Sequence, residues 1–166
     1  GGAESGVSDQ TTKLFIVVAN WEAPEVRKTS VCSGLRTDSS QRYEKTLDSN
    51  LCYRTLLRLV ELVTQLCPEA KVVGPVEKFV NESKLSQPLT LNISYDQIIS
   101  SLGMQIPKEQ IIDIFTRLDF KVADKNSSFE VTIPTYRTTK DISCKADLVE
   151  EIGRMKGLAA LPSISV

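Results

Sequence analysis

The sequence of 166 residues contains no histidine. This absence excludes a Ser-His-Asp triad and a Cys-His pair, and it removes the imidazole ligand that many zinc and iron sites use. Any chemistry must therefore use carboxylates, hydroxyls, thiols, amines or backbone groups. The sequence also lacks a Cys-x-x-Cys pair, since its cysteines stand at Cys32, Cys52, Cys67 and Cys144. We expect reduced thiols in a cytoplasmic protein and no zinc site.

Neither sign of charge dominates, and there is no long apolar run. Residues 1–83 carry 10 basic and 11 acidic side chains, and residues 84–166 carry 10 of each. A DNA-binding domain usually presents a basic surface, so DNA binding is not expected. No apolar run approaches the roughly 20 residues that span a bilayer, and no signal peptide is visible, so we expect no membrane contact.

The first 80 residues predict one mixed α/β unit. The run Lys13–Ala19 is apolar and β-branched, which is typical of a buried strand, and Val72–Val80 predicts a second strand. Pro24 begins a helix that ends near Gly34. From Ser49 to Cys67 the apolar residues recur at spacings of three and four, which predicts a long helix packed on a core. An early strand without a partner, in a chain that opens on Gly1 without methionine, suggests a piece of something longer.

A polar stretch at residues 81–88 predicts a linker, followed by a second unit at residues 89–160 and a tail at residues 161–166. Ser94 and Gln97 form a capping box. The expected elements are a strand at 89–93, helices from 94 to 103 and from 107, hairpin strands at 120–123 and 129–134, and a helix at 145–156. The whole chain is therefore predicted to be α+β, with a truncated mixed α/β segment before a small helix-plus-hairpin domain of winged-helix outline.

Acidic residues gather on the last predicted helix. Asp147, Glu150 and Glu151 stand at positions i, i+3 and i+4, so they share one flank, and Asp141 lies six residues upstream. Carboxylates without imidazole suit a hard cation such as Mg²⁺, which prefers oxygen ligands. The alternative is that acids in a first helical turn only balance the helix dipole.

A second candidate lies between Gly34 and Lys45. Small hydroxyl residues alternate there with Arg36 and Arg42, a composition that suits a phosphate or a polar pocket. The alternative is a polar turn followed by an amphipathic strand.

Two long motifs carry a resemblance to a known family. The string GLRTDSSQRYEK, preceded by GGAESGV and followed by LDSN, resembles the editing domain of the bacterial phenylalanyl-tRNA synthetase beta subunit. The strings IPKEQIIDIFTRLDFKV and VTIPTYRTTKDISCKADLVEEIGRMKG resemble the fifth domain of that subunit, a variant of the winged-helix architecture. The resemblance extends over about 155 of the 166 residues.

This resemblance implies a function for the parent protein. The family is an ATP-dependent ligase, an α2β2 heterotetramer that esterifies phenylalanine to tRNA-Phe on its alpha subunit. The beta subunit binds tRNA, packs on the alpha subunit and hydrolyses mischarged tyrosyl-tRNA. The present chain has no class II signature motif and no ATP site, so we expect a non-catalytic fragment that is inactive alone, with the alpha subunit and tRNA-Phe as partners.

The resemblance also implies an altered editing pocket. Its positions fall at Gly1, Thr37 and Ser39. At the position of Ser39 the family usually has alanine. Val17 stands where the family has an acidic residue that binds the tyrosine hydroxyl. A pocket that offers the phenol hydroxyl no hydrogen-bond partner no longer selects tyrosine, so we expect weak or absent editing. The family's editing histidine would lie before Gly1. Thr46 replaces the usual glycine after Glu-Lys.

Finally, the resemblance implies a Mg²⁺ ion shared with the alpha subunit. Asp141, Asp147, Glu150 and Glu151 match all four positions assigned to it, and we expect weak or no binding in the isolated chain. Two other classes of function stay open. One is a nucleic-acid-binding winged-helix module, and the other is a structural domain that only docks on its partner.

Overall fold

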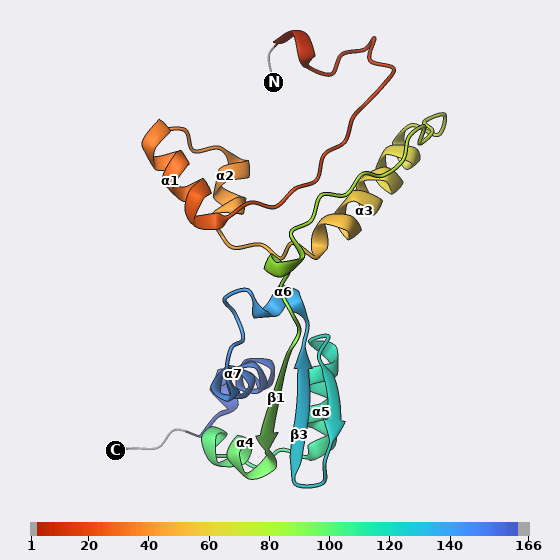
Figure 1. Cartoon of the computed structure of the whole chain (residues 1–166). Coiled ribbons are helices and arrows are strands. Elements are labelled where there is room, and N and C mark those ends of the chain that lie inside the picture. Colours follow the sequence, from red (N-terminus) through yellow and green to blue (C-terminus); the bar gives the residue numbers. More distant parts are fainter. Residues whose placement is uncertain (1–2, 163–166) are drawn as a thin grey trace.

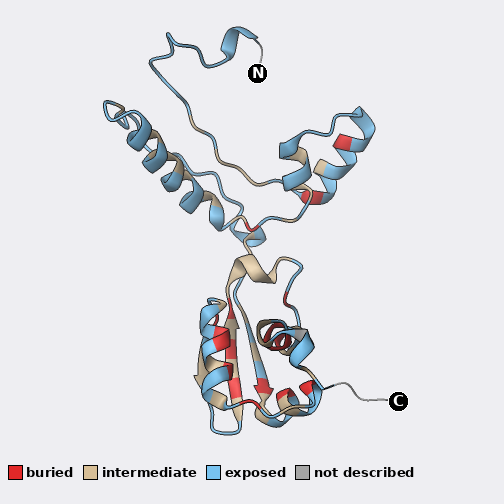
Figure 2. Cartoon of the chain, turned by 180° about the vertical axis from the view of Figure 1, so that it is seen from behind, coloured by how far each residue is buried: buried red, intermediate tan, exposed pale blue. Residues whose placement is uncertain are grey.

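The computed structural model describes residues 3–162 (Figure 1). Residues 89–162 form a closed unit, and two helical arms diverge from one end of it, α1 with α2 on one side and α3 on the other. Buried residues concentrate in the closed unit, and the arms are largely exposed (Figure 2). The two parts of the chain are therefore described separately.

The closed unit is built on a three-stranded antiparallel sheet. Its strands are β1 (Leu89–Ser94), β2 (Lys121–Asp124) and β3 (Ser128–Ile133), in the order β1-β3-β2. Val131 of the central strand stands opposite both Leu91 and Val122. Phe129, Val131 and Ile133 are buried while the residues between them are half-buried. Because side chains alternate along a strand, one face of the sheet carries the core.

Three helices supply the rest of this core. They are α4 (Tyr95–Leu102), α5 (Lys108–Arg117) and α7 (Lys145–Lys156). Their buried apolar residues are Ile98, Leu102, Ile111, Ile114, Phe115, Leu148 and Ile152. The rings of Phe115 and Phe120 stack with centroids 6.0 Å apart. The α+β class predicted from the sequence is confirmed.

Local signals place most of these elements where they were expected. The Ser94 hydroxyl accepts a hydrogen bond from the backbone amide of Gln97 at 3.1 Å. The side-chain carbonyl of Gln97 accepts one from the backbone amide of Ser94 at 3.2 Å, so the capping box of α4 is confirmed. Gly103 ends α4 with a φ of 67°, in the left-handed region that glycine adopts at helix ends. The hairpin and the helix at 145–156 are also confirmed. A four-residue helix, α6 (Thr135–Thr138), follows β3 and was not predicted.

The first part of the chain is helical. It contains η1 (Ala3–Ser5), α1 (Ala23–Ser33), α2 (Asp38–Tyr43) and α3 (Leu51–Leu66), so both predicted helices are confirmed. Two further short 3-10 helices are η2 (Glu82–Lys84), which precedes the closed unit, and η3 (Leu158–Ala160), which follows α7 inside it. Among the described residues, no helix combines the length and the apolar character needed to cross a membrane.

Two strand predictions in this first part are wrong. Residues 13–19 and 72–80 form no strand, and Phe15, Val73 and Phe79 are more than nine-tenths exposed. A strand requires a neighbour to bond its backbone groups, and an apolar sequence alone does not supply one. The core expected under α3 is absent as well, since no residue of α3 is buried.

The two parts meet at a buried carboxylate. Asp48 is 5% exposed, and its Oδ1 accepts hydrogen bonds from the backbone amide and side-chain amide of Asn50 at 3.0 and 2.9 Å. Its Oδ2 accepts from the hydroxyl of Thr135 at 2.5 Å. Asn50 also donates to the carbonyl of Ser86. The predicted domain limits at residues 80 and 89 stay a prediction, but the polar contacts near them join α3, the segment before β1, and α6.

Candidate functional site

The candidate acidic group lies at the start of α7. The carboxylate of Asp147 accepts hydrogen bonds from the backbone amides of Ser143 and Cys144 at 2.7 and 2.9 Å. These bonds favour the charged form and hold the pKa of Asp147 below its ordinary value. Asp147 therefore caps its own helix, in the way that acids near a helix N-terminus commonly do.

Glu151, one turn further along α7, is buried and neutralised. Its side chain is 10% exposed, with Oε1 at 3.1 Å from Nη2 of Arg137 and Oε2 at 2.6 Å from Nη2 of Arg154. Both carboxylate oxygens thus face a guanidinium. A buried charge needs such partners, because desolvation without them is costly.

The two remaining acids of the group behave differently. Asp141 pairs with Nε of Arg137, and Glu150 is exposed, with no ion pair within residues 3–162. Nowhere in the described part of the chain do three or more His, Cys, Asp or Glu side chains converge as a metal ion would require. The four carboxylates predicted to bind Mg²⁺ are not brought together, and as folded here they do not fit that ion.

Arg137 is the residue that sequence reasoning missed. Burial by itself lowers the pKa of Arg137, but its bonds and charge interactions with Asp141 and Glu151 outweigh burial and raise it. Its guanidinium carbon lies 5.5 Å from the centroid of the Phe120 ring. The spacing of four between Arg137 and Asp141 is the sequence signal that would have found the first of these pairs.

Three consecutive side chains of α6 bind carboxylates that come from other segments of the chain. Tyr136 donates a hydrogen bond of 2.6 Å to Asp119, which raises the pKa of Tyr136. The complete set pairs Thr135 with Asp48, Tyr136 with Asp119, and Arg137 with both Asp141 and Glu151. This short helix is therefore the polar centre of the region that joins the arms to the closed unit.

The predicted editing-pocket residues are not gathered into one cavity in the described structure. Gly1 lies outside the described residues. Val17 belongs to the extended segment and is 69% exposed. The hydroxyl of Thr37 accepts a hydrogen bond from the Ser40 amide at 3.1 Å and so caps α2, while Ser39 is exposed on that helix.

A polar hollow of about 360 Å³ lies in the same segment but is lined by other residues than Thr37 and Ser39. It is lined by Arg36, Asp38, Gln41, Arg42 and Lys45. Arg36 pairs with Glu44 at 2.8 Å, whereas Arg42 forms no ion pair in residues 3–162. The segment is a capped helix and not the amphipathic strand that was the alternative. Its basic side chains stay available to solvent.

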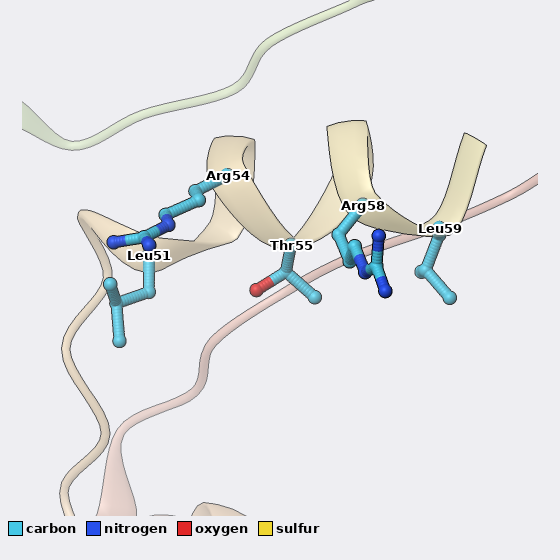
Figure 3. Close-up of a pocket in the computed structure, with 5 residues that line it drawn as sticks. All are labelled: Leu51, Arg54, Thr55, Arg58 and Leu59. Carbon is cyan, nitrogen blue, oxygen red and sulfur yellow. The ribbon is translucent and has the colours of Figure 1, made fainter. Parts of the chain in front are cut away.

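A second shallow hollow, of about 340 Å³, follows one side of α3. Figure 3 shows its lining side chains, Leu51, Arg54, Thr55, Arg58 and Leu59, which all come from that single helix. Arg58 pairs with Glu61 at 2.7 Å. Because one helix alone lines it, this hollow is a surface of mixed apolar and basic character and not an enclosed pocket.

Two sequence profiles match the chain in the order of its two parts. The B3/4 domain profile matches residues 1–68, and the tRNA synthetase B5 domain profile matches residues 91–158. The second match coincides closely with the closed unit, from β1 to η3.

The curated relatives extend this similarity to nearly the whole chain. The chain is 40% identical over 158 residues to the phenylalanine–tRNA ligase beta subunit of Solibacter usitatus, which covers 95% of the chain. It is 36% identical over 162 residues to the corresponding subunit of Leptospira biflexa and 34% identical over 163 residues to that of Bacillus licheniformis. In each case the chain spans about 20% of the relative's length.

Proposed function

We propose that the chain is one segment of a phenylalanine–tRNA ligase beta subunit, to which it is similar over nearly its whole length, and that it is a non-catalytic part of such a ligase. In the intact enzyme it would support the aminoacylation of tRNA-Phe by contributing to tRNA binding and to packing against the alpha subunit. The observation that carries this proposal is the order of the B3/4 and B5 matches along one chain.

The exposed apolar residues support a packing role. Phe15, Val73 and Phe79 are each more than 90% exposed in the first part of the chain. Free-standing domains seldom leave large aromatic and β-branched side chains so accessible, since burying them is favourable by about 1.5–3 kcal/mol each. Within a ligase, other parts of the protein would cover them.

The chain alone is proposed to be catalytically inactive. The test is ATP–pyrophosphate exchange with phenylalanine, measured for the isolated chain and for the intact ligase as a positive control. We expect no exchange above background from the chain. Phenylalanine-dependent exchange by the purified chain would overturn the proposal.

Editing is proposed to be weak in the parent protein. Val17 offers no hydrogen-bond partner to a tyrosine hydroxyl, and a site that leaves this group unpaired rejects or ignores it. In the intact ligase, Val17→Glu is expected to increase hydrolysis of tyrosyl-tRNA, whereas Val17→Leu serves as the apolar control. A wild-type enzyme that already edits efficiently, with no gain from Val17→Glu, would contradict this.

A Mg²⁺ site is proposed only for the assembled ligase. Asp141 and Glu151 would first have to exchange Arg137 for other partners, because the guanidinium now holds both carboxylates. Replacing Glu150 by Gln in the reconstituted ligase tests this role, since Glu150 has no ion pair to lose within residues 3–162. A drop in aminoacylation that excess Mg²⁺ relieves is expected, and unchanged activity would count against a metal role for this residue.

A nucleic-acid-binding module is the second candidate function. The three helices and three-stranded sheet of the closed unit favour it, as do Arg54 and Arg58 on α3. Binding through phosphate contacts would weaken steeply with salt. A titration with duplex DNA and with tRNA at several salt concentrations distinguishes the two candidate functions. Selective binding of tRNA supports the ligase role, and equal affinity for DNA and tRNA supports a general nucleic-acid-binding module.

A further inference from the structure

The loop between the two helical arms, residues 44–50, is hydrogen-bonded to segments on either side of it. The side-chain amide of Asn20, shortly before α1, donates to the carbonyl of Leu47 at 2.6 Å and to the hydroxyl of Ser49 at 2.9 Å. The side-chain amide of Asn50 donates to the carbonyl of Ser86, in the segment before β1, at 2.9 Å. The loop therefore connects the bases of both arms to the segment that enters the closed unit.

Asp48, in the same loop, makes the contact with the closed unit itself. Its Oδ1 accepts two hydrogen bonds from Asn50, and its Oδ2 accepts one from the hydroxyl of Thr135 on α6 at 2.5 Å. Figure 1 shows the bases of both arms, the segment before β1 and α6 meeting at this end of the closed unit. Because Asp48 is 5% exposed, water does not readily replace a bond that the carboxylate loses.

The hydrophobic core does not extend across this junction. Every residue of the core, and every half-buried apolar residue packed against it, lies between residues 89 and 161. The large apolar side chains that stay exposed in the described structure lie between residues 7 and 80 instead. Two parts of a chain move relative to one another by default unless a large apolar interface joins them. The direction of the arms therefore depends on the polar contacts of the loop.

We propose that Asp48 is a positioning residue, whose bond to Thr135 fixes the direction of the two arms relative to the closed unit. Loss of this bond releases the arms, while the closed unit keeps its fold because its core contains no residue of the arms. A hydrogen bond to a charged acceptor is stronger and more directional than one between neutral groups, which suits this role. The proposal concerns contacts within the chain, so it stands or falls independently of the ligase function.

An exposed ion pair near the same junction provides a matched control. Nζ of Lys84, on η2, lies 2.5 Å from the carboxylate of Glu22, which precedes α1. The two side chains are 61% and 58% exposed, and such pairs contribute little because water and salt screen them. Lys84→Gln therefore removes a polar link at the base of an arm without changing the buried carboxylate.

The test measures the distance between the second arm and the closed unit in the full 166-residue chain. Spin labels are attached to Cys67, which is exposed after the end of α3, and to a cysteine introduced by Lys125→Cys, in the exposed turn between β2 and β3. Double electron–electron resonance then gives the distribution of distances. Serine replaces the other three cysteines, Cys32, Cys52 and Cys144, so that only two labels attach.

The unsubstituted joint is expected to give one narrow distribution of distances. Thr135→Val and Asp48→Ala should each broaden it at least about twofold, since an arm released at a hinge samples more directions. The double variant should be no broader than the broader single variant, because both substitutions remove the same bond. Lys84→Gln should match the unsubstituted chain. The amide spectrum of the closed unit should stay dispersed throughout, with shifts confined to residues near α6.

The proposal is overturned if Thr135→Val leaves the distribution as narrow as before, or if the unsubstituted chain is already as broad as the variants. Equal broadening by Lys84→Gln would also contradict it, because the buried carboxylate would then have no special part. If Asp48→Ala unfolds the loop, Thr135→Val decides alone, since it changes only the side of the bond that belongs to the closed unit. Loss of the dispersed amide spectrum in Thr135→Val would show a role in folding and not in positioning.

Discussion

The hydroxyl of Thr135 donates a hydrogen bond of 2.5 Å to Oδ2 of Asp48, a residue 87 positions earlier in the chain. Asp48 precedes α3 and is buried, and Thr135 opens α6 directly after the central strand of the sheet. This bond links the helical arms directly to the closed unit. Its loss would leave one oxygen of a buried carboxylate unpaired.

Thr135→Val is therefore expected to lower the free energy of unfolding by about 2 kcal/mol, since bonds to a buried charged group contribute about 1.5–3 kcal/mol. Valine keeps the shape of threonine and removes only the hydroxyl. Thr116→Val is the control, because that hydroxyl bonds its own helix at the surface and its loss should cost much less. Urea unfolding measures both, and equal effects of the two substitutions would contradict the role of Asp48.

Thr46→Gly is expected to stabilise the protein. Thr46 has a φ of 59°, in the left-handed region that costs a residue with a side chain about 1–2 kcal/mol. Glycine avoids that cost, although its greater freedom in the unfolded chain cancels about 0.4–1 kcal/mol. The net gain should be about 0.5–1 kcal/mol by urea unfolding.

Asn126→Gly provides the comparison for Thr46→Gly. Asn126 has a similar φ of 66°, but asparagine tolerates this conformation better than a β-branched residue does. A smaller gain is therefore expected at Asn126. A larger gain there than at Thr46 would show that strain at Thr46 is not the cause.

Asp147→Ala should destabilise α7 by about 1 kcal/mol at neutral pH, the usual effect of losing a helix cap. Because the folded state lowers the pKa of Asp147, its contribution is present above the ordinary value of 3.8 and is lost as the pH falls through the lowered value. The difference in stability between wild type and variant should therefore shrink in acid. A difference that stays constant down to the acid transition would rule out this cap.

Tyr136→Phe tests the bond to Asp119. The folded state raises the pKa of Tyr136, chiefly through this hydrogen bond, so the stabilisation is complete below the ordinary value of 10.0 and is lost as the pH rises through the raised value. Spectrophotometric titration should show one tyrosine that ionises at a pH above the ordinary tyrosine pKa. Tyr136→Phe should remove this late ionisation step. Tyr53→Phe, on the exposed surface of α3, should leave that late step in place.

The closed unit was predictable because its signals are local and agree with one another. Ser94 with Gln97 marks the start of α4, Gly103 marks its end, and Gly157 follows α7 directly. Periodicity then identifies the buried faces, such as Leu148 and Ile152 on α7. Each of these features needs no information beyond a few neighbouring residues.

The first part of the chain was harder because its strands depend on distant partners. The runs at 13–19 and 72–80 have strand composition, yet strand formation requires backbone pairing that composition does not encode. The prediction that the acidic residues lie together depended in the same way on distant partners. Spacing placed Glu150 and Glu151 on one flank of α7, but the structure buries Glu151, which pairs with Arg137 of another element, and leaves Glu150 exposed.

The paired side chains of α6 constrain the length of the chain around it. An extra residue turns a helix by about 100°, so an insertion between Thr135 and Arg137 would prevent these two side chains from reaching their acids together. Deletion of a residue has the same consequence. Related chains that keep these pairs should therefore tolerate changes of length elsewhere, such as the turn between β2 and β3, while the spacing from β3 through α6 stays constant.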